Sequence, residues 1–172
     1  MRVLGIDPGS QIMGVGILDA EGNATTHVFS ESLRLPKGEL PPRLGRIFQR
    51  LDELIAEFKP DLMAIEKVFL AKNPQAALTL GHARGAAILA GVNAGLSVSE
   101  YSATQIKKTI VGRGRADKSQ VQHMVRVLLN LRSVPEVDES DALACAICHV
   151  HHQHSAQLLE KQADLASRMK FQ

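Results

Sequence analysis

The chain has 172 residues, of which 45% are hydrophobic, so it can bury one core but has no room for a second full domain. Its 20 Lys and Arg residues nearly balance its 18 Asp and Glu residues, and the net charge of +2 falls short of the strongly basic balance typical of nucleic-acid-binding proteins. No uncharged apolar stretch approaches the ~20 residues needed to span a bilayer, which excludes a membrane-spanning protein.

The N-terminal residues predict three strands. Residues 2–6 form an apolar run that ends in a turn sequence, Asp-Pro-Gly-Ser, so Asp7 is expected at the end of a buried strand. Residues 12–18 and 24–35 predict two further strands, separated by the turn residues 21–23. Together these segments predict an antiparallel meander.

A helix and a fourth strand follow. Between Pro42 and Pro60, apolar residues recur at positions i, i+3, i+4 and i+7, which predicts an amphipathic helix. Residues 62–65 predict a short strand that ends at Glu66. Because a strand reached through a helix usually lies parallel to its predecessor, we expect Glu66 to lie near Asp7.

The remaining residues predict a helix over 74–94, a strand over 97–101 and three more helices. Capping-box patterns at Ser102 and Asp117 open two of these helices, and the second is expected to run through Leu131. The last helix is expected to begin around residues 138–140.

This order of elements predicts an α/β protein with a mixed five-stranded sheet flanked by helices, which is the ribonuclease H-like plan. We expect residues 1–155 to form that single domain. Residues 156–172 are expected to form a charged C-terminal tail, either helical or disordered.

Four acidic residues are expected to meet at one edge of the sheet. Asp7 and Glu66 follow adjacent strands, and Asp138 and Asp141 are spaced i, i+3 on one helix face. Taken singly, each has a structural explanation, such as a turn contact or a favourable charge at a helix N-terminus. Together, they would repel one another unless divalent cations neutralised them, and oxygen-only ligands favour Mg²⁺. Because two such ions can activate water and stabilise a departing oxygen, we predict phosphodiester hydrolysis.

Basic residues are densest around a Gly-rich loop, at Lys107, Lys108, Arg113, Arg115 and Lys118. They could neutralise DNA phosphates, or they could form a solvated charged face. Phe69 lies three residues after Glu66 in a chain that is only 3% aromatic. It could stack on an unstacked base, or it could anchor a loop in the core.

Six motifs occur in an order that spans nearly the whole chain. They are Gly5-Ile-Asp-Pro-Gly-Ser10, Ile65-Glu-Lys-Val-Phe69, Leu80-Gly-His-Ala-Arg-Gly85, Glu100-Tyr-Ser102, Val111-Gly-Arg-Gly-Arg-Ala-Asp-Lys118 and Asp138-Glu-Ser-Asp-Ala-Leu-Ala144. Together they resemble the RuvC family of bacterial Holliday-junction resolvases. Ala103 and Ala76 depart from the residues that this family commonly carries, Pro and Ser, but neither is a proposed metal ligand.

The resemblance implies a homodimeric endonuclease that resolves four-way junction DNA by symmetric nicks and cooperates with the RuvA and RuvB branch-migration proteins. The residues that match the family's catalytic, metal-binding acids are Asp7, Glu66, Asp138 and Asp141. The implied cofactor is Mg²⁺, two ions per site, with Mn²⁺ as a substitute. The residues favoured for DNA contact are Phe69, Lys107, Arg115 and Lys118.

Other signals receive less weight. The sequence Cys145-Ala-Ile-Cys148-His149 matches the pattern for haem attachment and, with nearby histidines, suggests zinc. However, it lies in an Ala/Ile/Val-rich helix where cysteines pack well, and two cysteines cannot form a disulfide framework, so a cytoplasmic location is expected. His149 shares a helix face with Asp138 and Asp141, which makes a supporting role near the metals a hypothesis.

Two rival functions remain open. Actin-like kinases and ATPases use a similar Asp-x-Gly hairpin to hold nucleotide phosphates, but they generally close two such domains around the nucleotide, and this chain has room for one. A non-catalytic junction-binding protein on the same scaffold would be expected to lose its acids, whereas all four are present.

Overall fold

The computed structural model describes residues 1–22, 24–68 and 73–169, with side-chain surroundings given up to residue 162. A five-stranded mixed sheet lies at its centre, in the order β3-β2-β1-β4-β5. The strands are β1 (Arg2–Asp7), β2 (Ile12–Glu21), β3 (Ala24–Arg34), β4 (Leu62–Lys67) and β5 (Ser97–Ser102). Strands β1, β2 and β3 form an antiparallel meander, whereas β4 is parallel to both β1 and β5. The predicted α/β fold class and both predicted strand pairings are confirmed.

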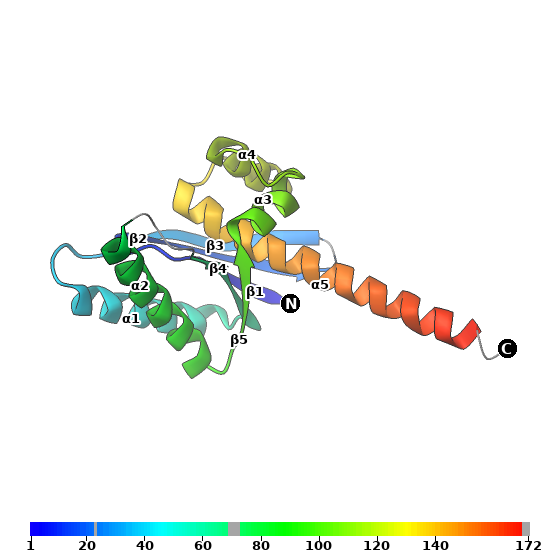
Figure 1. Ribbon diagram of the computed structural model, residues 1–172, viewed down its shortest axis with the longest axis horizontal. Helices are drawn as coiled ribbons and strands as arrows, with labels where there is room; N and C mark the ends of the chain where they lie inside the picture. The colour runs from blue at the N-terminus through cyan, green and yellow to red at the C-terminus, as the bar shows by residue number, and fades with distance from the viewer. Residues whose placement is uncertain (23, 69–72, 170–172) are drawn as a thin grey trace.

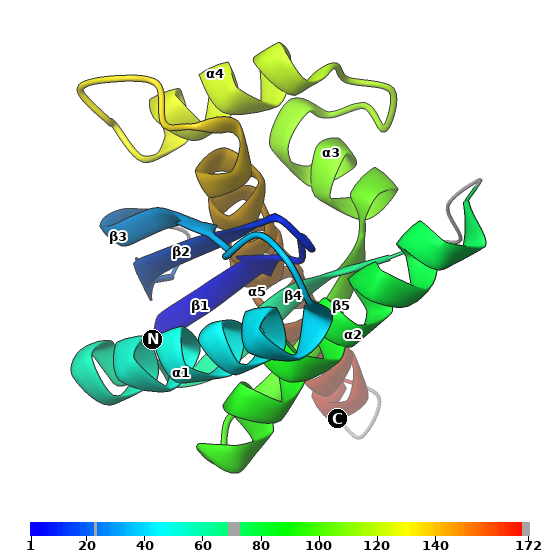
Figure 2. The same cartoon turned by 90° about the vertical axis from the view of Figure 1, so that its left-hand side faces the viewer.

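Helices cover both faces of the sheet (Figures 1 and 2). On one face lie α1 (Leu40–Phe58) and α2 (Pro74–Asn93), whose buried residues form one hydrophobic cluster with the sheet. On the other face lies α5 (Val137–Met169), with α3 (Ala103–Val111) and α4 (Lys118–Leu128) packed against it. The sheet therefore separates two cores, and α5 lies between the sheet and the α3–α4 pair.

The helix boundaries differ from the predicted ones for local reasons. Helix α1 begins at Leu40, because Pro41 and Pro42 occupy the first turn, where a missing backbone N–H removes no helical hydrogen bond. Helix α4 ends at Leu128 rather than Leu131. Asn130 adopts a positive φ of 49°, which an α-helix cannot continue through.

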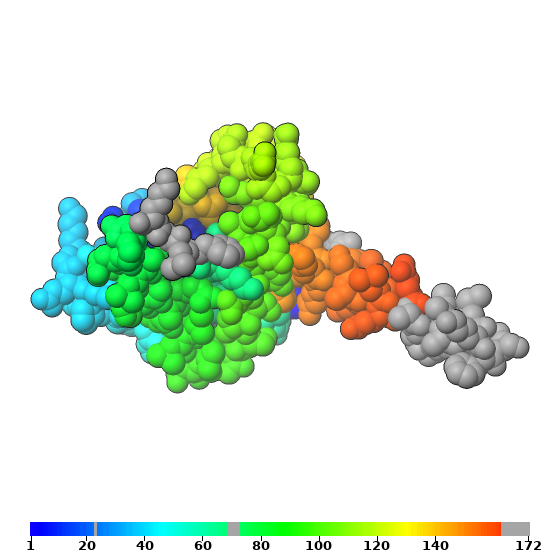
Figure 3. Space-filling view, in the orientation of Figure 1, coloured from blue at the N-terminus to red at the C-terminus, as the bar shows by residue number. Residues whose placement is uncertain are grey.

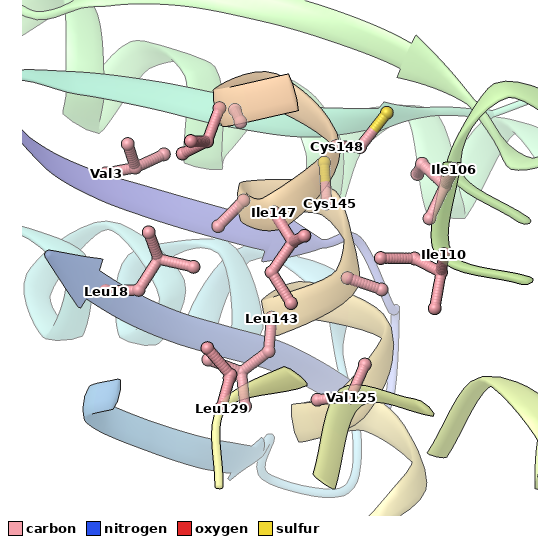
Figure 4. Packing of buried hydrophobic residues seen from close by; sticks show 14 of the residues in the cluster. Val3, Leu18, Ile106, Ile110, Val125, Leu129, Leu143, Cys145, Ile147 and Cys148 are labelled. Atoms are coloured by element: carbon pink, nitrogen blue, oxygen red, sulfur yellow. The ribbon is translucent and has the colours of Figure 1, made fainter. Parts of the chain in front are cut away.

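Both cysteines belong to α5 and are packed in the hydrophobic cluster that this helix forms with the sheet, α3 and α4. Cys145 and Cys148 are buried and free, and Figure 4 shows their sulfurs among the apolar side chains of this cluster. Burial raises the pKa of both thiols, so neither is a ready thiolate. Their surroundings are those of small core residues, as their place in an Ala/Ile/Val helix predicts.

Helix α5 is 33 residues long and extends past the sheet (Figures 1 and 3). It includes the described part of the segment predicted as a tail, up to Met169. Its side chains are buried from Ala142 to Val150, but those from Ser155 to Gln162 are exposed. None of the described helices is sufficiently long and apolar to cross a membrane.

Candidate active site

A cavity of about 220 Å³ lies where the carboxyl ends of β1 and β4 meet helices α3, α4 and α5. This edge of the sheet faces the viewer in Figure 2. The cavity combines three acids with two lysines and an apolar wall, and we call it the acidic cavity. Its lining residues are Asp7, Glu66, Asp141, Lys107, Lys118, Ala103, Ile106 and Val121. Three of the four predicted acids and two of the predicted DNA-contacting lysines are thus brought together.

Asp7 reaches the cavity because it is the last residue of β1, and it pairs with Gly14 across the antiparallel ladder. A Cβ atom at Gly14 would lie 2.0 Å from the Asp138 carbonyl oxygen and 3.2 Å from Asp7 Cβ. Similar collisions with α5 would occur at Gly5 and Gly16. These glycines let the α5 backbone lie directly on the sheet, next to Asp7. Their role was not predicted, although glycines at alternate positions of an apolar strand signal close backbone approach.

The first turn of α5 is anchored to β3, the edge strand of the meander. Arg34 forms an ion pair with Glu136 at 3.1 Å, and Ser30 Oγ donates a hydrogen bond of 2.9 Å to Glu139. Glu136 precedes Asp138 by two residues, and Glu139 follows it directly. These two contacts fix the start of the helix that carries the catalytic candidates.

Burial and mutual repulsion act on the acids of the cavity. Burial, followed by the charges of Glu66 and Asp141, raises the pKa of Asp7 to about 8, and Asp138 adds a smaller effect in the same direction. Burial also raises the pKa of Glu66, with a further contribution from Asp141. The pKa of Asp141 is raised by burial too, although Lys118 opposes the rise. Burial and the neighbouring acids therefore disfavour the charged form of all three carboxylates, and Lys118 offsets this only in part.

The two lysines supply part of the missing positive charge. Lys118 Nζ lies 3.4 Å from Asp141 Oδ2, with its side chain 68% exposed, and Lys107 is half-buried in the cavity wall. Arg115 is exposed between α3 and α4 and is not among the residues that line the cavity. Phe69, the fourth predicted DNA contact, lies outside the described residues.

Asp138 occupies a different place from the other three acids. It is not among the residues that line the acidic cavity, but its carbonyl lies beside Gly14 and its charge raises the pKa of both Asp7 and Asp141. In the part of the chain that the structure describes, no three His, Cys, Asp or Glu side chains are grouped so that they could hold a metal ion by themselves.

The chemical type of the candidate ligands nevertheless fits magnesium. All the candidate ligands are carboxylates, and a bound cation would favour the ionised form of the three whose pKa values burial raises, Asp7, Glu66 and Asp141. Mg²⁺ usually takes only one or two carboxylates and completes its shell with water and substrate phosphates. An incomplete protein cage is therefore compatible with a metal that binds together with a phosphodiester.

His149 has a partner other than these acids. It is buried, its Nδ1 lies 3.0 Å from the Tyr101 hydroxyl, and it is not among the residues lining the acidic cavity. Burial lowers the pKa of His149, which favours the neutral ring. His149 therefore pairs with Tyr101 of β5, and the hypothesis that it supports the metal site stays a hypothesis.

The sequence matches one protein family along most of its length. The model of the family described as crossover junction endodeoxyribonuclease RuvC matches residues 3–149. A protein of that name from Geobacter metallireducens is 57% identical over 152 residues, covering 88% of this chain and 93% of the relative. One from Alkalilimnicola ehrlichii is 48% identical over 169 residues, covering 98% and 96%.

Solved structures agree with this match. RuvC of Thermus thermophilus in complex with a Holliday junction substrate superposes with a TM-score of 0.85 at 33% identity, covering 91% of this chain and 96% of that one. A yeast mitochondrial Holliday junction resolvase gives a TM-score of 0.65 at 12% identity, with 96% and 85% covered, which shows a shared fold. The ribonuclease H-like architecture inferred from the order of elements is confirmed by these neighbours.

Proposed function

The chain belongs to the RuvC family of crossover junction endodeoxyribonucleases, and from this we propose that it resolves four-way DNA junctions by Mg²⁺-dependent phosphodiester hydrolysis in the acidic cavity. The observation that carries the proposal is the convergence of Asp7, Glu66 and Asp141 in one cavity with two lysines. Partly buried acids with raised pKa values and a nearby charged partner are typical of functional sites.

We propose that Asp7, Glu66 and Asp141 hold the metal, with Asp138 completing the set. Bound there, two Mg²⁺ ions would activate a water molecule and stabilise the departing 3′ oxygen of the scissile strand. The buried floor formed by β1, β4 and α5 keeps the carboxylates in place, so little reorganisation is required when the phosphate arrives. The apolar wall of Ile106 and Val121 limits the water that reaches the reacting group.

The proposed DNA contacts surround this cavity. Lys107 and Lys118 line it, so each can reach a backbone phosphate beside the reacting bond. Arg115 is exposed on the loop between α3 and α4, where it can contact a phosphate farther along an arm. Phe69 is proposed from the family motif alone as the residue that stacks on a base at the junction.

The exposed apolar face of α2 supports the proposal that the protein is a homodimer. Leu78, Leu89 and Val92 are more than half exposed there, and Cβ atoms at Gly81 and Gly85 would meet nothing within 4 Å. A junction with two equivalent strands to cut requires two active sites, so we propose that a second copy covers this face in an isologous contact.

The dimer proposal is tested with Leu89→Lys, which places a charge in the proposed interface. Sedimentation equilibrium should show a shift toward monomer, and junctions should be nicked singly rather than in pairs. Lys59→Glu, at the end of α1 and away from this face, serves as the control. A Leu89→Lys protein that remains dimeric at micromolar concentration would exclude this interface.

Cooperation with the RuvA and RuvB proteins is proposed from family membership alone. Pull-down of this chain by RuvA–RuvB assembled on a synthetic junction, compared with the junction alone, tests it. Equal recovery in both samples would count against the partnership.

The catalytic proposal is tested with Asp7→Asn. This substitution removes the charge of the most strongly perturbed acid while preserving its shape, so cleavage of a synthetic junction in Mg²⁺ should fall by at least about 1,000-fold. Junction binding measured in EDTA should change little. Asp52→Asn on the exposed side of α1 is the matched control and should cut at the parent rate.

Two outcomes would contradict the proposal. If the Asp7→Asn protein cuts at the parent rate, the acidic cavity is not the catalytic site. If the parent enzyme cuts linear duplex and junction DNA equally well, the proposed phosphodiester hydrolysis stands, but the proposed preference for four-way junctions is wrong. Nicks mapped at symmetric positions on both strands complete the test of paired cleavage.

A further inference from the structure

Arg84 links helix α2 to the strand that carries Glu66. The Arg84 side chain is 21% exposed, and its Nε donates a hydrogen bond of 3.2 Å to the backbone carbonyl of Glu66. Its Nη2 forms an ion pair with Glu100 on the edge strand β5. One guanidinium therefore joins α2 to two strands, β4 and β5, at the edge of the sheet where the acidic cavity opens.

Glu66 lies where the support from the neighbouring strand ends. The pairing of β1 with β4 stops at Ile6 and Ile65, so Glu66 has no pairing partner on the β1 side. On the other side it pairs with Tyr101 of β5. Its carboxylate lines the same cavity as that of Asp141, so the direction of this strand end decides how the two carboxylates are placed. The Arg84 hydrogen bond to the Glu66 carbonyl holds this strand end where pairing with β1 has stopped.

The role of Arg84 is geometric rather than electrostatic. The positive charges that oppose the raised pKa of Glu66 are those of Lys118 and Lys107, both lining the cavity. The charge of Arg84 is matched by Glu100, and its donor is directed at a carbonyl rather than at the Glu66 carboxylate. Arginine suits this task because its planar fork holds two acceptors in a fixed geometry.

We propose that Arg84 is a positioning residue, which fixes the end of β4 so that the Glu66 carboxylate points into the acidic cavity before metal and DNA arrive. The inference rests on the proposed function of Glu66 as a metal ligand. It does not place Arg84 in contact with the substrate. Groups that orient metal ligands typically change metal affinity by about 10- to 100-fold when they are replaced.

The test compares Arg84→Met and Arg84→Lys with the parent enzyme. Binding of Mn²⁺ to the full-length protein without DNA, followed by electron paramagnetic resonance, should weaken by about 10-fold in Arg84→Met. The Mg²⁺ concentration that gives half-maximal cleavage should rise similarly, so that excess Mg²⁺ restores part of the rate. Arg84→Lys keeps a single donor and should fall between the parent and Arg84→Met.

Two further measurements separate positioning from general damage. Hydrogen exchange of the metal-free protein should become faster at the end of β4, around Glu66 and Lys67, while the buried strand β1 keeps its protection. Junction affinity in EDTA should stay within about twofold of the parent value, because Arg84 is not proposed to touch DNA. Arg46→Met, an exposed arginine of α1, is the matched control.

Parent-like Mn²⁺ affinity in Arg84→Met would overturn the inference, as would a loss no larger than that of Arg46→Met. If Arg84→Met does not fold, the same comparison is made with Arg84→Lys. Glu66→Gln distinguishes this failure from failure of the proposed function. If Glu66→Gln cuts normally, Glu66 is not a metal ligand; if Glu66→Gln is inactive while Arg84→Met is normal, only the positioning role is wrong.

Discussion

Asp7 is partly buried beside three acidic neighbours, Glu66, Asp138 and Asp141, and this affects the stability of the protein. Burial and the nearby carboxylates raise its pKa to about 8, whereas its ordinary value is 3.8. Between those two values the folded state binds more protons than the unfolded chain. The free energy of unfolding of the metal-free protein should therefore fall as the pH rises from about 4 to about 8.

Asp7→Asn should remove this pH-dependent loss. One pKa unit corresponds to ~1.4 kcal/mol, and after discounting for water that reaches the cavity we expect the variant to be about 2 kcal/mol more stable than the parent at pH 8 in EDTA. At pH 4 the gain should largely disappear. Urea unfolding at both pH values measures the difference, and an equal gain at both would contradict the explanation.

Gly14 is the residue that allows Asp7 and Asp138 to approach each other. Gly14→Ala would place a methyl group 2.0 Å from the Asp138 carbonyl, so α5 must move away from the sheet. We expect a loss of about 1–3 kcal/mol in the free energy of unfolding, as is typical of overpacking, together with reduced cleavage.

The control for Gly14→Ala is Gly45→Ala in α1, where a Cβ would meet nothing within 4 Å. Alanine is a better helix former than glycine, so this variant should be neutral or more stable by up to about 1 kcal/mol. Thermal unfolding of both variants measures the contrast. Equal effects would show that the approach of α5 does not depend on Gly14.

Helix α3 presents Lys107 and Ile106 to the acidic cavity, and its start is set by a complete capping box. The Ser102 hydroxyl accepts a hydrogen bond from the Gln105 amide, and the Gln105 side chain accepts one from the Ser102 amide. The helix ends at Gly112, which adopts a φ of 78° that favours glycine. Local chemistry thus fixes both ends of the element.

Ser102→Ala should cost about 1 kcal/mol in the free energy of unfolding, because the Gln105 amide loses its acceptor. Fraying at the start of α3 should also weaken junction binding, since Lys107 lies in the second turn of this helix. Ser102→Thr keeps the hydroxyl and should retain both properties. Chemical denaturation and a binding titration in EDTA distinguish the two variants; identical behaviour would show that the cap has no influence.

Capping boxes and hydrophobic periodicity are local features, which is why the elements were predicted more completely than the site. Both capping boxes begin helices where predicted, at Ser102 and Asp117. The end of α4 was placed too late, because no sequence signal required the positive φ at Asn130. The β3 contacts that anchor the first turn of α5, from Ser30 and Arg34, join residues far apart in the chain and could not be predicted.

At the scale of the whole molecule, the sheet and both of its helical layers are complete before α5 ends. Among the residues of that helix up to Gln162, the last buried one is Val150, and those from Ser155 to Gln162 are exposed. We propose that residues 1–155 form the folding unit. The exposed extension then contributes to solution behaviour or contacts rather than to the core.

A chain ending after Ser155 tests this division. Because it keeps both hydrophobic clusters, its free energy of unfolding should lie within about 1 kcal/mol of the full-length value. Cleavage of a synthetic junction should be retained. A matched chain ending after Ala144, which removes the buried part of α5 from Cys145 onward, should fail to fold. If the chain ending after Ser155 loses stability, the domain boundary lies farther along the helix.

The sequence by itself determined the order of the elements, the strand ends that carry Asp7 and Glu66, and the i, i+3 spacing of Asp138 and Asp141. These follow from turn residues and periodicity, which act over a few positions. Only the tertiary structure decided that Asp7, Glu66 and Asp141 line one cavity, that Lys118 pairs with Asp141, and that Arg84 contacts the Glu66 backbone. Those arrangements depend on how α2, α4 and α5 pack around the sheet. Local sequence patterns do not specify the distances between packed elements, so these contacts could not be predicted.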